Sequence, residues 1–244
     1  MRAVFAIIYS DLIRLFRAKA VLASFVLTPL LLIVFLYLFF YSVSPSTTLY
    51  LISTFIVLGA YLPAFSAGLT LVTEKEFGTF KEILAAPISN TEIILGRILF
   101  SAMMIVIFPI ILLIASSLLG FVGPELNFNL LFGLASIALT AFYLGCTSLI
   151  IALVIERSVS FQSIVALASF PLIVVSNAFL PLKEMPLILK QIVLLNPLTY
   201  TFDLLRFSLG LYYEFDPLYS LLILFFVTVL SFVACVAFFR KKFS

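Results

Sequence analysis

Long apolar runs separated by short polar links dominate the chain. Six runs reach the length of about 20 residues that a helix needs to cross a hydrocarbon core of about 30 Å. They cover residues 21–41, 48–72, 93–122, 130–155, 159–180 and 217–239. Short polar links at 42–47, 123–127 and 156–158 favour antiparallel neighbours. The pattern predicts an all-α integral membrane protein with six transmembrane helices.

Two further segments have a different pattern. Residues 1–20 place Arg14 and Arg17 on one helical face and apolar residues on another, which predicts an N-terminal amphipathic interfacial helix held by anionic headgroups. Residues 21–244 then form one six-span domain. Within it, residues 181–216 hold prolines, charges and apolar pieces too short to cross, which predicts an interfacial or half-inserted segment before the last span.

Composition agrees with a membrane protein. The chain is 64% hydrophobic and 10% charged, and its mean hydropathy of +1.31 excludes a single soluble core. Cys146 and Cys235 lie far apart in apolar runs, so we expect small lipid-facing or packing residues rather than a disulfide framework or a metal pair. With lipid as the surrounding partner, no nucleic-acid partner is expected.

Basic residues indicate the orientation. With both termini cytoplasmic, 11 of the 14 Lys and Arg residues lie inside, and only Lys183, Lys190 and Arg206 lie outside. This bias follows the positive-inside rule. It predicts a multi-pass protein with both termini in the cytoplasm, and it makes the charged stretch after the second run cytoplasmic.

That stretch, "EKEFGTFKEILAAPIS" at 74–89, predicts a short helix of its own. Gly78 ends the preceding helix, Thr79 and Glu82 have the spacing of a capping box, and Pro87 stops the new helix near residue 86. A second capping box at Ser89 and Glu92 begins the third span.

The short helix at 79–86 is amphipathic. Phe80, Ile83 and Leu84 share an apolar face, whereas Lys81 and Glu82 are polar. From the residues alone, a helix that anchors to the membrane surface and one that docks a partner remain equally open.

Two other patterns concern packing. In the second run Ala60, Ala64 and Gly68 recur every four residues, which favours close helix packing within one subunit or, as a sharper alternative, at a dimer contact. In "NPLTYTFDLLRFSLG" Asn196 is a plausible N-cap with Pro197 at the first helical position. Asp203 and Arg206 share a face of this outer-mouth helix, where we expect them to pair at i and i+3. A lid without any role in substrate handling is the alternative.

The run "EKEFGTFKEILAAPISNTEIILGRIL" resembles the signature of the membrane subunits of ATP-binding-cassette (ABC) type-2 exporters, whose members export drugs, polysaccharides and sterols. "NPLTYTFDLLR" is similar to the segment before the last span of that family. The first match comprises, in order, Glu74, Glu76, Gly78, Thr79, Glu82, Leu84, Pro87, Ser89, Glu92, Gly96 and Arg97. With six spans, the likeness covers essentially the whole chain.

The resemblance implies a permease subunit in the cell membrane. Its helix at 79–86 would be a coupling helix that fits a cleft on a separate ABC ATPase subunit, and that subunit would bind ATP and Mg²⁺. Two permeases, identical or paralogous, would sit on two ATPases and export a lipophilic drug, a lipid or a lipid-linked glycan. Helices at 181–216 would be re-entrant and close the exit. The residues implied in ATPase coupling are Glu74, Glu76, Gly78, Thr79, Phe80, Lys81, Glu82 and Pro87.

Several other functions lack their residues in this sequence. No G-x-x-x-x-G-K-[ST] motif occurs, so we expect a transport subunit without its own ATPase site and no cofactor in this chain. Without histidine, Ser-His pairs and helix-borne zinc sites are excluded. Charged residues fall outside or near the ends of the apolar runs, which disfavours an ion-coupled secondary transporter or channel. A non-transporting scaffold or sensor is the third alternative.

Overall fold

The computed structural model describes residues 2–17, 45–86, 88–118 and 129–243, together with residues 19, 23, 27, 31, 34, 35 and 38. These ranges contain helices and no strand. The helices are α1 (Arg2–Arg17), α3 (Pro45–Ala64), α4 (Ser66–Glu76), α5 (Phe80–Ala85), α6 (Asn90–Leu118), α7 (Asn129–Val154), α8 (Ser158–Val174), the 3₁₀ turn η1 (Leu182–Glu184), α9 (Leu187–Leu194), α10 (Pro197–Ser208) and α11 (Pro217–Phe243). The predicted all-α class is confirmed for the part of the chain that the structure describes.

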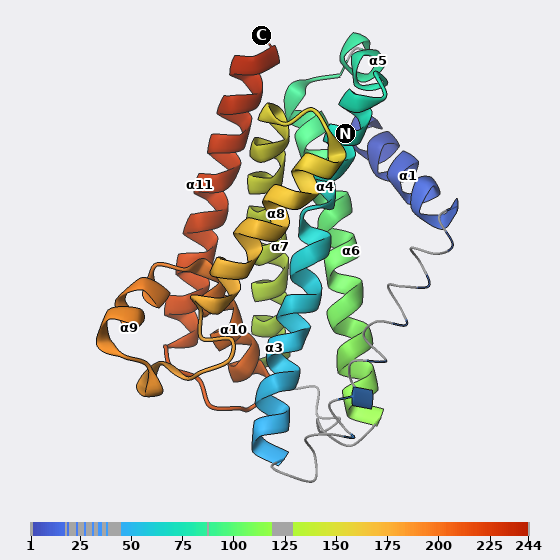
Figure 1. Ribbon diagram of the computed structural model, residues 1–244. Helices are drawn as coiled ribbons and strands as arrows, with labels where there is room; N and C mark the ends of the chain where they lie inside the picture. Colours follow the sequence, from blue (N-terminus) through green and yellow to red (C-terminus); the bar gives the residue numbers. More distant parts are fainter. Residues whose placement is uncertain are drawn as a thin grey trace.

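Helix α7 lies at the centre of the bundle. It packs against α3, α4, α6, α10 and α11, while α1 packs on α6 (Figure 1). The short helix α5 lies at the same end of the bundle as α1 and the C-terminus of α11 (Figure 1). Helices α9 and α10 lie toward the opposite end. This arrangement separates the two segments that the sequence marked as functional.

The predicted spans match the helices unequally. Among the described residues, three helical stretches are long and apolar enough to cross a membrane, namely Thr91–Ile111, Asn129–Val154 and Pro217–Lys242. The second predicted span is divided into α3 and α4, and the fifth, α8, has 17 residues. The first predicted span, 21–41, lies almost entirely outside the described residues.

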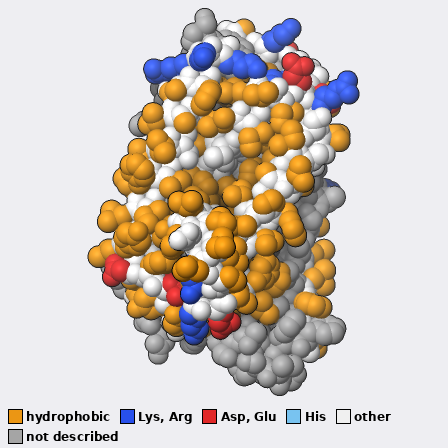
Figure 2. Space-filling view, turned by 60° about the vertical axis from the view of Figure 1, so that its left-hand side comes forward, with side chains coloured by type: hydrophobic (Ala, Val, Ile, Leu, Met, Phe, Trp, Pro, Cys, Tyr) orange, Lys and Arg blue, Asp and Glu red, His pale blue; other side chains and the backbone are white. Residues whose placement is uncertain are grey.

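Charged and apolar side chains separate along the bundle axis. Basic side chains gather at the end that carries α5, a second charged group lies near the other end, and apolar side chains cover the surface between them (Figure 2). Helix α11 exposes much of this apolar surface, including Leu222, Phe226 and Leu230. A broad uncharged band between two charged ends is the surface expected of a protein within a bilayer.

The two cysteines are neighbours in space. Cys146 of α7 and Cys235 of α11 are both fully buried, and their thiols interact with one another. Of the two expectations, packing rather than a lipid-facing position is confirmed, although separation in sequence gave no sign that the two would meet. Both are free thiols.

Candidate functional site

The last three residues of α4 contact four other helices. Glu74, Lys75 and Glu76 follow one another, so their side chains leave α4 in three directions, about 100° apart. We call these three residues the charged clamp. They lie directly before the turn that leads into α5, so the clamp joins the short helix to the helices of the bundle.

Glu74 lies in a cluster of four charges, three of which are buried. Its carboxylate accepts hydrogen bonds from Arg97 of α6 and from Arg14 of α1, the latter at 2.8 Å. Arg97 also reaches Asp11 of α1, with 3.4 Å between Nη1 and Oδ2. Asp11, Glu74 and Arg97 are only 5%, 3% and 2% exposed. Two acids and two bases therefore neutralise one another where α1, α4 and α6 meet.

Asp11 is the least satisfied member of this cluster. Burial raises the pKa of its carboxyl above the ordinary value of 3.8, and the charge of Arg97 opposes that shift. Its Oδ1 has no hydrogen-bond partner. The docking of α1 is therefore the part of the cluster that protonation affects most directly.

Lys75 caps the C-terminus of α7. Its ammonium donates to the carbonyl oxygens of Ala152, Leu153 and Ile155 at 2.9, 3.3 and 2.6 Å. Carbonyls in the last turn of a helix have no partner within the helix, and the negative end of the helix dipole attracts a cation there. Lys242 of α11 donates to the Leu153 carbonyl as well. The α7 terminus is thus bound to α4 and α11 together.

Glu76 caps the N-terminus of α8. Its carboxylate accepts from the Ser158 amide at 2.9 Å and from the Ser158 hydroxyl. The residue before α8, Arg157, makes no side-chain cap of its own. The hydrogen bond from the Ser158 hydroxyl, followed by that from its amide, lowers the pKa of Glu76 below its ordinary value. Glu76 thus supplies the missing cap from another helix.

A glycine turn carries the chain from the clamp into α5. Gly78 has φ of +80°, a left-handed conformation that glycine adopts without a Cβ clash. Helix α5 then buries Phe80, whose ring contacts Phe239 of α11 edge to face at 6.5 Å. Ile83 packs on the same core. Lys81 and Glu82 are exposed, so the short helix presents its polar side to the solvent.

The structure corrects two expectations at this end. Thr79 makes no side-chain cap for α5, because its hydroxyl turns back to the Glu74 carbonyl at 3.5 Å. Glu74, expected to contact a partner, is buried and bound within the chain. The second capping box is confirmed, since Ser89 and Glu92 exchange hydrogen bonds of 3.2 and 3.3 Å. Pro87 lies outside the described residues.

Sequence reasoning missed the partners of the clamp. The sequence pattern assigns Arg14 only to one face of an amphipathic helix and gives Lys75 no partner. The available signal was Asp11, an acid set among apolar positions of α1 with the basic Arg14 one turn later. In the part of the chain that the structure describes, five charged side chains are nearly fully buried, which no pattern in the sequence indicates. They are Asp11, Glu74, Arg97, Asp203 and Arg206.

At the opposite end, α10 binds the helices around it. Asn196 caps α10 by accepting from the Leu198 amide at 3.1 Å, and Pro197 occupies the first turn as predicted. The Asn196 amide donates to the carbonyls of Leu172 and Val175 at the end of α8. One residue therefore begins α10 and fixes the C-terminal end of α8.

Asp203 and Arg206 do not form the expected pair along α10. Asp203 accepts from the backbone amides of Glu214 and Phe215 at 2.6 and 3.0 Å. Arg206, only 2% exposed, points the other way and binds α3. Each charge thus fixes a different neighbour of α10, which explains why this motif holds both.

The Arg206 guanidinium lies in an aromatic and polar pocket of the chain itself. It stacks over Tyr50 at 3.7 Å from the ring centroid and donates to the hydroxyls of Ser53 and Thr54, both at 3.3 Å. It also donates to the Ala178 carbonyl at 3.0 Å. These bonds hold α3, α10 and the chain after α8 together.

The small-residue stripe packs within the chain. Ala64 is fully buried, and a Cβ added at Gly68 would lie 2.4 Å from the Ser148 carbonyl oxygen of α7. The side chain of Ala60 lies outside the described residues. Of the two alternatives for the stripe, Ala64 and Gly68 support packing within one subunit.

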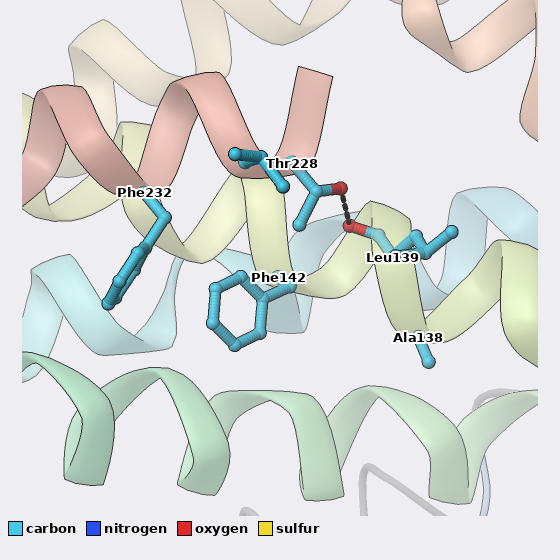
Figure 3. Close-up of a pocket in the computed structure, with 6 residues that line it drawn as sticks. Ala138, Leu139, Phe142, Thr228 and Phe232 are labelled. Atoms are coloured by element: carbon cyan, nitrogen blue, oxygen red, sulfur yellow. Dashed lines mark hydrogen bonds between the residues drawn. The ribbon is translucent and has the colours of Figure 1, made fainter. Parts of the chain in front are cut away.

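A shallow apolar groove of about 400 Å³ lies between α7 and α11 (Figure 3). The Thr228 hydroxyl is already engaged by the carbonyls of Leu139, at 3.2 Å, and Leu224. The groove is therefore suited to hydrocarbon alone. Its lining residues are Ala138, Leu139, Phe142, Thr228, Val229 and Phe232. Within the described residues no group of three or more His, Cys, Asp or Glu side chains is placed to hold a metal ion.

Comparison with known proteins identifies relatives over most of the chain. The sequence profile described as "ABC-2 type transporter" matches residues 2–209. A protein of Porphyra purpurea named "Putative transport permease ycf38" is 30% identical over 212 residues, which cover 83% of this chain and 72% of the relative. Its namesake in Pyropia yezoensis is 29% identical over the same shares. The namesake in Cyanophora paradoxa is 29% identical over 158 residues, 62% of this chain and 52% of the relative.

Proposed function

Because the chain belongs to the ABC-2 type transporter family, we propose that it is the permease subunit of an ABC exporter and that α5 is its contact with the ATPase. The observation that carries the proposal is the charged clamp, which joins α5 to α1, α6, α7 and α8. ATP and Mg²⁺ bind to the partner subunit. This chain supplies the passage and the response to ATP.

The geometry supports a route for force from α5 into the spans. Phe80 and Ile83 hold α5 on the bundle, while Lys81 and Glu82 remain free to contact a partner. A displacement of α5 passes through the turn at Gly78 to the clamp. Since the clamp holds the ends of α7 and α8 by their unpaired backbone groups, those ends move with it.

Assembly with a second permease, identical or paralogous, follows from the surface of α8. This helix buries only one side and exposes large apolar residues, among them Val159, Leu167 and Phe170. No charged residue lies between Arg157 and Lys183. A passage bordered by two such faces suits a lipophilic drug, a lipid or the lipid part of a glycan carrier, moved outward across the cell membrane.

Orientation completes the proposal. Basic side chains gather with α5 at one end of the bundle (Figures 1 and 2), which supports a cytoplasmic location for that end and for both termini. Helices α9 and α10 then lie at the outer mouth. There α10 holds the outer ends of α3 and α8 and closes the passage until those ends separate.

Purification with the ATPase tests the proposal. Reversing both exposed charges of α5, in the double variant Lys81→Glu and Glu82→Lys, should abolish co-purification of the ATPase while the permease stays folded. Reversal of the exposed outer residue Lys183→Glu is the matched control and should retain it. In proteoliposomes, ATP should drive flux in the parent. Flux driven by an ion gradient without ATP would instead support a secondary transporter, and no flux with no bound ATPase would support a scaffold or sensor.

A further inference from the structure

The second span is interrupted at the centre of the bundle. Helix α3 ends at Ala64 and α4 begins at Ser66, with Phe65 between them in a turn. Pro63 lacks an N–H, so it cannot donate to the carbonyl of Gly59 as helix geometry requires. Breaks of this kind occur inside membranes only where neighbouring groups bind the freed backbone.

Two serines from other helices bind the backbone at this break. The Gly68 amide donates to the Ser148 hydroxyl of α7 at 3.0 Å, and the Ala64 carbonyl accepts from the Ser101 hydroxyl of α6 at 3.5 Å. In an unbroken helix the Gly68 amide would donate to the Ala64 carbonyl instead. Each half of the span is thus bound to a neighbouring helix through a side-chain hydroxyl, Ala64 to α6 and Gly68 to α7, in place of the direct backbone bond between the two residues.

The halves on either side have partly different partners. Both α3 and α4 pack on α6 and α7, but α10 packs on α3, whereas α5 and α8 pack on α4. Close contact between α4 and α8 begins directly after the break, because a Cβ added to Gly68 would lie 2.7 Å from the ring of Phe161 in α8. The Ser66 hydroxyl is buried there without a partner, so the break holds a spare hydrogen-bonding group.

We propose that residues 63–68 are a hinge, positioned by Ser101 and Ser148, about which α4, α5 and the start of α8 move as one body against α3. The clamp makes the inner body rigid, because Glu76 fixes α8 to α4. The outer half stays bound to α10 through Arg206. The link of this motion to ATP depends on the proposed function, whereas the hinge itself does not.

Amide exchange on the permease alone in nanodiscs tests the hinge without the ATPase. Amides of residues 65–69 should exchange at least tenfold faster than those in the middle of α3 and α4, because local opening is easiest at the break. Ser148→Ala should speed exchange at Gly68 by roughly three- to tenfold, the range for one lost interhelical hydrogen bond. Ser136→Ala is the matched control, since that buried α7 hydroxyl bonds to the Gly133 carbonyl of its own helix.

Distances between spin labels test the motion in the assembled complex. Cysteines replacing Lys81, Ser160 and Glu184 report on α5, α8 and the outer segment, all at exposed positions. ATP with vanadate should change the 81–184 distance and leave the 81–160 distance constant, and Pro63→Ala should reduce the change.

Three results would each overturn the hinge. The first is amide protection at 65–69 equal to that in the middle of α3 and α4, and the second is an equal effect of Ser148→Ala and Ser136→Ala on exchange at Gly68. The third is an equal change in the 81–184 and 81–160 distances. Absence of a bound ATPase would instead refute the proposed function, and the exchange result would still decide the hinge.

Discussion

The buried cluster around Glu74 gives the sharpest quantitative prediction. Glu74→Gln leaves Arg97 in a site that is 2% exposed, with Asp11 at 3.4 Å as its remaining counter-charge. Removing one partner of a buried ion pair costs about 3–5 kcal/mol, and the retained Asp11 favours the lower end. A loss of about 3 kcal/mol increases the opening equilibrium between α1 and α6 by about 100-fold.

Cysteine labelling of α1 measures that opening. Ile7 is buried against α6, where a Cβ on Gly96 would lie 3.0 Å from it. In a background without the two native cysteines, Ile7→Cys should react with a water-soluble maleimide about 100-fold faster when Glu74→Gln is added. Arg14→Ala should raise the rate by only about twofold, because Arg14 is 55% exposed at its side chain and its ion pair is screened. Equal rates with and without Glu74→Gln would refute the account of the cluster.

Three further predictions concern other parts of the chain. Because burial raises the pKa of Asp11 in docked α1, the docked state binds the proton more tightly, so labelling at position 7, measured relative to an exposed cysteine at the same pH, should slow as pH falls through the raised pKa; Asp11→Asn should remove the pH dependence of this ratio. Gly78→Ala places a side chain at φ +80° and should cost about 1–2 kcal/mol, measured as a lower Tm in detergent; no clash contributes, since nothing lies within 4 Å of the added Cβ. Arg206→Lys keeps the charge but loses the planar guanidinium group that donates to both α3 and the Ala178 carbonyl. It should therefore lower the free energy of unfolding by about 2 kcal/mol, measured in the same assay. An unchanged Tm in either variant, or a pH profile that survives in Asp11→Asn, would contradict the corresponding reasoning.

Local patterns predicted local structure well. The helix at 79–86, the turn at Gly78, the Ser89 and Glu92 box and the Asn196 cap each depend on residues within four positions of one another, and the first differs from α5 by one residue at each end. Apolar length predicted α6, α7 and α11 for the same reason.

Contacts between distant segments were not predictable from such patterns. Glu76 caps a helix that begins 82 residues later, and Arg206 binds residues about 150 positions earlier. Their charge and position suggested exposed or local partners, because nothing in the sequence marks which backbone ends will lie nearby. Pro63 by itself indicates a missing backbone hydrogen bond in the second span, but the serines that support the break come from two other helices.

Crosslinking from α5 tests the central claim most directly. A photoreactive residue replacing Lys81, at the exposed side of α5, should crosslink to the ATPase subunit in native membranes, and the same residue replacing Gln191 on α9, toward the opposite end of the bundle, should not. If position 81 never reaches a nucleotide-binding protein, or reacts with reagents confined to the outside of the cell, α5 does not connect this permease to a source of energy.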